Sequence, residues 1–189
     1  MTIIRAVPDG EAPESVEHYY AEDRAALGHV ATYTMAMSVN PGAYAAFRAL
    51  TASTIESLGF RGFELVTLAA ALGTGSPHCR LAHGLKALKV FDEAQLERIA
   101  LDYTDAGLSD AEVAMMRFAE QLARDSAGMT DADTLRLREA GFSDRQIVDI
   151  TVAAAARVYF GRALQALGVE VDVPPSLSEP LRIALLDGV

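Results

Sequence analysis

Helix start and stop signals recur along most of this 189-residue chain, and they constrain its fold more than any other feature. Ser109 and Glu112 form a Ser-x-x-Glu capping box, and Ser143 and Gln146 form the related Ser-x-x-Gln box. Glycines that end helices follow the apolar runs, at Gly59, Gly128, Gly141 and Gly168. No segment alternates apolar and polar residues for long enough to build a sheet. The pattern therefore predicts an all-α protein.

The length of the chain suits one well-filled domain, so we predict a single all-α domain over residues 1–189. Its core is a helical hairpin over about residues 61–91, followed by helices over about residues 109–168. Residues 169–189 are expected to form an irregular tail, because Val173-Pro174-Pro175 and Pro180 interrupt them. The apolar residues within 144–167 suit a buried contact between subunits, which favours a homo-oligomer.

Composition excludes several classes of partner. The formal net charge of −10 disfavours nucleic acid and anionic membrane surfaces. The uncharged, apolar run at residues 65–79 is broken by glycines and a proline, so no membrane span is expected. The N-terminus has no apolar signal-peptide core, which makes the cytoplasm the default location. A single cysteine leaves no internal disulfide and no thiolate cluster for zinc. No haem, flavin or nucleotide motif is present, so no cofactor is expected.

The only cysteine stands where a helix is expected to begin. Ser76 is the expected N-cap and Pro77 the first helical residue, which puts Cys79 in the opening turn. Unpaired N–H groups and the helix dipole favour a thiolate there. His83 lies one turn further on the same face, where it can exchange a proton with the sulfur. His78 is adjacent in sequence but points in a different direction.

Glu64 shares the apolar stripe of the preceding helix with Leu68 and Leu72. A carboxylate on a buried face is costly unless it is paired or protonated. The hairpin across residues 73–76 folds Glu64 back toward Cys79 and His83, which predicts a relay of these three side chains.

Plainer interpretations stay open for each residue. A lone cysteine in a reducing compartment is usually an inert core residue. Glu64 could instead pair with Arg61 or Arg80, and Ser76 is fully explained as an N-cap. A metal site formed by Cys79, His83, Glu64 and His78 is disfavoured, because the expected side-chain directions do not converge well.

The same residues resemble a family pattern. AhpD-like alkylhydroperoxidases and carboxymuconolactone decarboxylases carry a glutamate, twelve residues later a Cys-x-x-Cys, and a histidine four residues after the second cysteine. Glu64, Ser76, Cys79 and His83 match this spacing, and His78 matches a histidine often found before the second cysteine. Residues 61–66 and 116–167 also resemble the peroxidase-related subgroup of this family. The resemblance covers roughly residues 15–172.

The resemblance implies that Cys79 is the peroxidatic residue and that Glu64 and His83 form its proton relay. In active members the first cysteine donates a proton and later resolves the sulfenic acid as a disulfide. Ser76 stands at that position here and cannot form a disulfide, so an external thiol reductant is needed.

Three functions are therefore considered. The first is a one-cysteine peroxidase with an antioxidant role, which acts on hydrogen peroxide or organic hydroperoxides. The second is a non-redox enzyme similar to the lactone decarboxylases, with Glu64 and His83 as acid and base. The third is a helical oligomer without catalytic activity, in which side chains fill the space around Cys79.

Overall fold

In the computed structural model, residues 4–189 are described, and they form helices and loops without a β-strand among them. The α-helices are α1 (Glu14–Leu27), α2 (Thr32–Met37), α3 (Pro41–Thr74), α4 (Pro77–Ala87), α5 (Glu93–Asp102), α6 (Asp110–Asp125), α7 (Asp131–Glu139), α8 (Asp144–Ala166) and α9 (Glu179–Leu186). Two short 3₁₀ turns, Tyr103–Asp105 and Ser126–Gly128, follow α5 and α6. The all-α prediction is confirmed.

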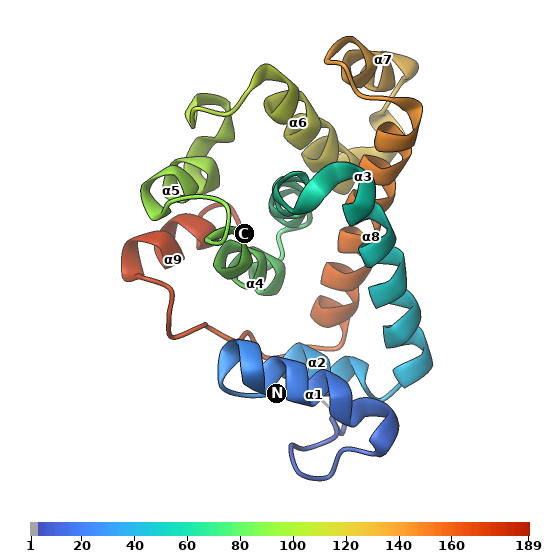
Figure 1. The fold of residues 1–189 in the computed structure, drawn as a ribbon, viewed down its shortest axis with the longest axis vertical. Helices are drawn as coiled ribbons and strands as arrows, with labels where there is room; N and C mark the ends of the chain where they lie inside the picture. Colours follow the sequence, from blue (N-terminus) through green and yellow to red (C-terminus); the bar gives the residue numbers. More distant parts are fainter. Residues whose placement is uncertain (1–3) are drawn as a thin grey trace.

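The long helix α3 is the centre of the molecule (Figure 1). Helices α8, α6 and α4 pack against it. Gly59 bends α3, because its backbone (φ 67°, ψ 163°) leaves the helical region for one that glycine adopts most readily. The bend gives α3 two halves, Pro41–Leu58 and Phe60–Thr74, which run in different directions.

The helix starts lie where the capping residues predict them. Both capping boxes form, with Ser109 and Glu112 at the start of α6 and Ser143 and Gln146 at the start of α8. The Asn40 side chain accepts a hydrogen bond from the Ala43 amide at the start of α3. These local bonds satisfy amides that have no partner inside the helix.

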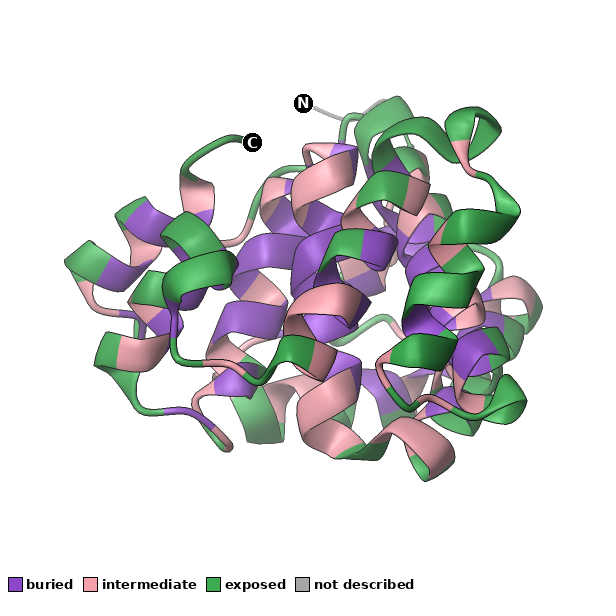
Figure 2. Ribbon diagram, turned by 90° about the horizontal axis from the view of Figure 1, so that it is seen from above, coloured by how far each residue is buried: buried purple, intermediate pink, exposed green. Residues whose placement is uncertain are grey.

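Buried side chains form two cores. Figure 2 shows the buried residues gathered on the inward sides of the helices. The larger core joins the second half of α3 to α4, α5, α6, α9 and the first half of α8. The smaller core joins α1, α2 and the first half of α3 to the second half of α8. Cys79 belongs to the smaller core, although α4 packs mainly in the larger one.

The prediction of an irregular tail is wrong for its last part, because residues 179–186 form α9. Ser178 caps this helix and Pro180 lies in its first turn, where a proline needs no amide partner. The proline thus starts a helix rather than preventing one. α9 packs against α5 and α4, and Gly84 provides the space, since a Cβ there would lie 2.3 Å from the Leu185 side chain.

Many apolar residues of helix α8 pack inside this chain. Ile147, Ile150 and Ala154 lie in the larger core, while Phe160 and Leu164 lie in the smaller one. Part of the apolar composition of residues 144–167 is thus explained by packing within the chain, while Val148 and Tyr159 are exposed, and the homo-oligomer stays a prediction. None of the helices formed by residues 4–189 is long and apolar enough to cross a membrane.

Candidate active site

The start of α4 places Cys79 as the sequence predicts. The Ser76 side chain accepts a hydrogen bond from the Cys79 amide at 3.4 Å, and Pro77 is the first residue of the helix. Ser76 is fully buried against Gly161 of α8, where an added Cβ would lie 3.1 Å from Ser76 Cβ. The N-cap role of Ser76 is confirmed, and it ties the start of α4 closely to α8.

The sulfur of Cys79 contacts a buried arginine that the sequence did not reveal. Arg157 of α8 places its Nη1 3.8 Å from Cys79 Sγ, and both residues are almost completely buried. The guanidinium also lies over the rings of Phe47 and Phe160, at 5.8 and 5.7 Å from their centroids. The sulfur therefore lies against a buried positive charge.

Glu64 and His83 form the buried pair that the hairpin predicts. Glu64 Oε2 lies 2.7 Å from His83 Nδ1, and the two residues are 1% and 5% exposed. Arg61 instead binds Glu112, and Arg80 binds the backbone carbonyl groups of Ala100, Ala184 and Leu185. Neither arginine is therefore the partner of Glu64.

Burial sets the protonation of this pair. Desolvation raises the pKa of Glu64 from 4.5 to about 7, although the nearby cations Lys86 and Arg157 oppose the shift. Desolvation also lowers the pKa of His83 well below its usual value, and Arg157 and Lys86 act in the same direction. When Glu64 is ionised, the neutral ring donates from Nδ1 to the carboxylate, and Nε2 is left free to accept a proton.

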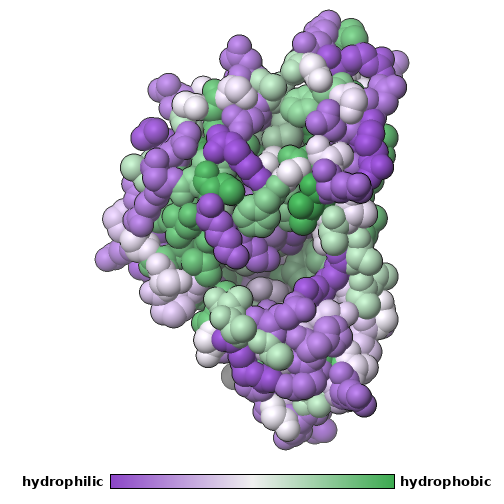
Figure 3. Space-filling view, viewed as in Figure 1, coloured by the Kyte–Doolittle hydropathy of each residue, from purple (hydrophilic) through white to green (hydrophobic). Residues whose placement is uncertain are grey.

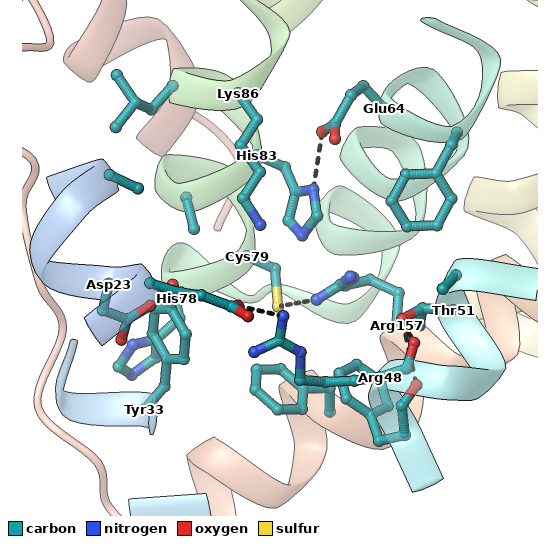
Figure 4. Close-up of a pocket in the computed structure, with 18 of the residues that line it drawn as sticks. Asp23, Tyr33, Arg48, Thr51, Glu64, His78, Cys79, His83, Lys86 and Arg157 are labelled. Carbon is teal, nitrogen blue, oxygen red and sulfur yellow. Dashed lines mark hydrogen bonds and ion pairs between the residues drawn. The ribbon is translucent and has the colours of Figure 1, made fainter. Parts of the chain in front are cut away.

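His78 takes a different position. Its Nε2 lies 3.0 Å from the Val169 carbonyl oxygen, and burial lowers its pKa. Figure 4 shows its ring on the side of Asp23 and Tyr33, away from the Glu64–His83 pair. Across the described residues, no group of three or more His, Cys, Asp and Glu side chains is arranged to hold a metal ion.

These side chains surround a cavity of about 470 Å³ between the two cores. Figure 3 shows the face of the molecule hollowed between α1–α2 and α4. We call the side formed by residues 60–74 of α3 and by residues 77–89 the hairpin wall; it carries Glu64, Cys79 and His83. The opposite wall comes from α1, α2, the first half of α3 and α8. Its lining residues are Glu22, Asp23, Ala26, Leu27, Tyr33, Tyr44, Phe47, Arg48, Thr51, Ala52, Ile55, Arg157 and Phe160.

The sequence therefore predicted the reactive residues of the hairpin wall but not the residues of the opposite wall. Arg157 follows a run of alanines in α8, where a charged residue inside an otherwise small, apolar helix is a signal comparable to that of Glu64. Arg48 interrupts a similar apolar stretch, residues 43–50, and carries the same kind of signal, whereas Tyr33 carries none, because tyrosine occurs at both buried and exposed positions. The space beside Cys79 is open rather than filled by side chains, although Cys79 itself is only 2% exposed.

Solved structures share this arrangement of helices over nearly the whole chain. The alkylhydroperoxidase AhpD core of a peroxidase-related protein from Ralstonia eutropha JMP134 superposes with a TM-score of 0.75 at 21% identity, covering 95% of this chain and 94% of that chain. A peroxidase-related protein from Silicibacter sp. TM1040 gives a TM-score of 0.78 at 24% identity, over 90% and 92% of the two chains. The chain has the AhpD-like fold.

The same fold carries another activity. The debrominase Bmp8 superposes with a TM-score of 0.78 at 16% identity, covering 98% of this chain and 97% of that chain. Bmp8 has also been solved in complex with 2,3,4-tribromopyrrole. No family model and no curated protein matches the sequence. The AhpD-like fold alone therefore does not specify the reaction of this chain.

Proposed function

We propose that this protein is a one-cysteine peroxidase of the AhpD-like family that reduces hydroperoxides through Cys79. The single observation that carries the proposal is the contact between Arg157 Nη1 and Cys79 Sγ at the edge of an open cavity. A buried cation, together with the first turn of α4, favours the thiolate, which is the nucleophilic form of cysteine.

The proposed oxidation uses the hairpin wall for proton transfer. His83 Nε2 takes the proton of the thiol, and the Cys79 sulfur attacks one oxygen of the hydroperoxide. The O–O bond breaks, the sulfur is oxidised to a sulfenic acid, and the leaving alkoxide receives the proton back from His83 as an alcohol. Glu64 is the positioning residue, since its carboxylate fixes the imidazole tautomer that keeps Nε2 free.

The proposed return step needs two molecules of an external thiol. The first attacks the sulfenic sulfur, which forms a mixed disulfide and releases water. The second attacks that disulfide, which restores the Cys79 thiol and releases the oxidised reductant as a disulfide. Ser76 cannot take this role, because its hydroxyl caps α4 and forms no disulfide. Small thiols are abundant in the cytoplasm, where we place the protein as a homo-oligomer with an antioxidant role.

The test is mass spectrometry after brief exposure to peroxide in the presence of a sulfenic-acid trap and of glutathione as an internal competitor. We expect the peptide that contains Cys79 to carry the trap adduct well before glutathione is oxidised. Cys79→Ser is the control and should give no adduct. Oxidation of Cys79 no faster than that of glutathione contradicts the proposal.

A second candidate is favoured by the Glu64–His83 pair, which is complete without the cysteine. In this alternative the pair performs proton transfer on a lactone or keto acid, and Cys79 is a bystander. Turnover of such a substrate should then survive Cys79→Ser and be lost in His83→Gln. If Cys79→Ser is inactive as well as His83→Gln, the cysteine is needed and the thiol mechanism is supported.

A further inference from the structure

Four cationic side chains and three carboxylates line the cavity beside Cys79. Arg48, Lys86, Lys89 and Arg157 all line it, in a chain whose formal net charge is −10. Figure 4 shows the charged groups of Arg48, Lys86 and Arg157 turned toward the space in front of the Cys79 sulfur. Cations outnumber carboxylates here, four to three, whereas carboxylates outnumber cations in the chain as a whole, 26 to 16, so this cavity favours a ligand with negative charge more than the rest of the molecule does.

The carboxylates at the cavity are already engaged. Glu22 binds Arg48 at 2.6 Å, Asp23 accepts a hydrogen bond from the Ala31 amide at 3.0 Å, and Glu64 holds His83. Within residues 4–189, no ion pair includes Lys86, Lys89 or Arg157. The protein itself therefore leaves these cations without a carboxylate.

Arg157 is the least satisfied of these groups. It is 5% exposed, and its Nε is a buried donor with no hydrogen-bond partner among the residues that the structure describes. A buried guanidinium that lacks a full set of acceptors is costly unless a ligand supplies them. The Cys79 sulfur accepts a hydrogen bond from Nη1 and not from Nε.

Lys86 stands on α4 one turn after Ala82 and lines the same cavity. Lys86 is an exposed residue, and the protein packed around its side chain lowers the pKa of its ammonium through desolvation. Glu64 opposes this shift, while Arg157 adds to it. Desolvation strengthens the attraction between this ammonium and an anion bound beside it.

The rest of the cavity suits a flat apolar body. Phe47 and Phe160 stack with their centroids 4.5 Å apart and their planes within 9°, and Tyr44 stacks on Phe160. Tyr33, Phe60 and Phe63 complete the aromatic lining. A water molecule takes about 30 Å³ in the liquid, so the cavity of about 470 Å³ is far larger than hydrogen peroxide requires.

We propose that the substrate of this site is an organic anion, a hydroperoxide whose aromatic body carries a carboxylate bound by Lys86 and Arg157. The inference rests on the proposed function for the reaction at Cys79, but the binding site itself does not. The aromatic walls hold the body of the substrate, and the two cations hold its carboxylate while the peroxide group faces the sulfur. Arg48 completes the positive side of the cavity and stays bound to Glu22.

The binding test removes the redox chemistry. The Cys79→Ser variant is titrated by calorimetry with 2-naphthoate and with its neutral analogue 2-naphthamide. We expect 2-naphthoate to bind about tenfold more tightly or better, as one charge-assisted hydrogen bond allows. Lys86→Gln in the same background should reduce this preference, because only Arg157 is left to bind the carboxylate, without weakening the binding of 2-naphthamide. Arg162→Gln is the matched control, because Arg162 is an exposed cation of α8 outside the cavity.

The kinetic test uses the wild-type chain and a pair of hydroperoxides. Cumene hydroperoxide is compared with its ring-carboxylated analogue, and the rate of Cys79 oxidation is followed for each. We expect the carboxylated compound to react faster, and the advantage to fall in Lys86→Gln and Arg157→Lys but not in Arg162→Gln. Arg157→Lys keeps a positive charge at the buried position, so the test stays decisive if an uncharged residue there prevents folding.

The outcomes separate the two proposals. If 2-naphthoate binds selectively but neither hydroperoxide oxidises Cys79 rapidly, the anion site stands and the peroxidase function fails. If both hydroperoxides oxidise Cys79 rapidly at equal rates and 2-naphthoate binds no better than 2-naphthamide, the peroxidase function stands and the anion site is overturned.

Discussion

The hairpin wall and the opposite wall of the cavity are built in different ways. Glu64, Cys79 and His83 come from two helices joined by a single turn, and one N-cap and one proline fix where the second helix begins. The opposite wall brings together Tyr33 of α2, Arg48 of α3 and Arg157 of α8, which are far apart along the chain. The hairpin wall holds the groups that move protons together with Lys86 and Lys89, while the opposite wall adds two arginines and most of the aromatic rings.

The site therefore depends on the contact between the larger core and the smaller core. Cys79 is carried by α4 yet packs in the smaller core, so its sulfur lies where the two cores meet. Gly161 and Ser76 make this contact close, and Arg157 lies one turn earlier on α8. A change in either wall should therefore alter the sulfur, but through different physical effects.

Removing the base from the hairpin wall should have the largest effect. His83→Gln keeps a polar side chain beside Glu64 but leaves no group that accepts the thiol proton. We expect the rate of Cys79 oxidation at neutral pH to fall by roughly a hundredfold or more, the usual range for general acid–base catalysis. Stopped-flow kinetics with hydroperoxide provides the measurement, and the exposed His18→Gln is the control. An unchanged rate would remove His83 from the mechanism.

The buried pair should also appear in the pH dependence of stability. In the folded protein the pKa of Glu64 is about 7, against 4.5 when unfolded, so the folded state binds more protons between these values. The free energy of unfolding therefore falls as pH rises through this window, by at most about 3 kcal/mol. His83 acts in the opposite sense, because its pKa is lowered on folding and stability is lost as pH falls below its ordinary value of 6.5.

Glu64→Gln should remove the first contribution and leave the second. We expect the variant to gain stability relative to wild type at pH 8 and to lose that advantage at pH 5. Urea unfolding at the two pH values measures the difference, with Glu139→Gln as a control at an exposed position. If the free energy of unfolding changes with pH by the same amount in the variant and in wild type, the ionisation of Glu64 costs no additional free energy in the folded protein.

The smallest of these effects should come from the contact between the walls. Gly161→Ala places a Cβ 3.1 Å from Ser76 Cβ and 3.2 Å from Thr74 Cγ2, so α8 and the start of α4 must move apart. We expect a loss of about 1–3 kcal/mol in the free energy of unfolding, together with slower oxidation of Cys79.

Gly62→Ala is the matched control for this variant. It lies inside α3, and its added Cβ meets Leu58 Cβ at 3.6 Å, which is ordinary contact. Alanine has a higher helix propensity than glycine, so we expect this variant to lose no stability and to gain up to about 1 kcal/mol in the free energy of unfolding. Chemical denaturation and the oxidation rate of each variant decide the comparison. Equal behaviour of the two alanine variants would show that the approach of α8 to α4 is not a constraint on the site.

Much of the fold was predictable from local chemistry. Capping residues such as Asn40, Ser109 and Ser143 specify helix starts through bonds to amides three residues away, and these bonds form as expected. The failure at Pro180 has a local reason as well, because a proline that breaks a helix interior also suits a first turn. α1 and α2 were not predicted, since their buried residues are few and mixed with polar ones.

The position of Cys79 in the first turn of α4 and the pairing of Glu64 with His83 follow from the amino-acid sequence, because both depend on spacing within one hairpin. The contact of Arg157 with the sulfur, the open cavity and the cations that line it follow instead from the packing of distant helices. These features depend on how α8 and the bent α3 pack around α4. Local bonds fix the position of a residue within its own helix, but contacts between distant segments fix what lies opposite.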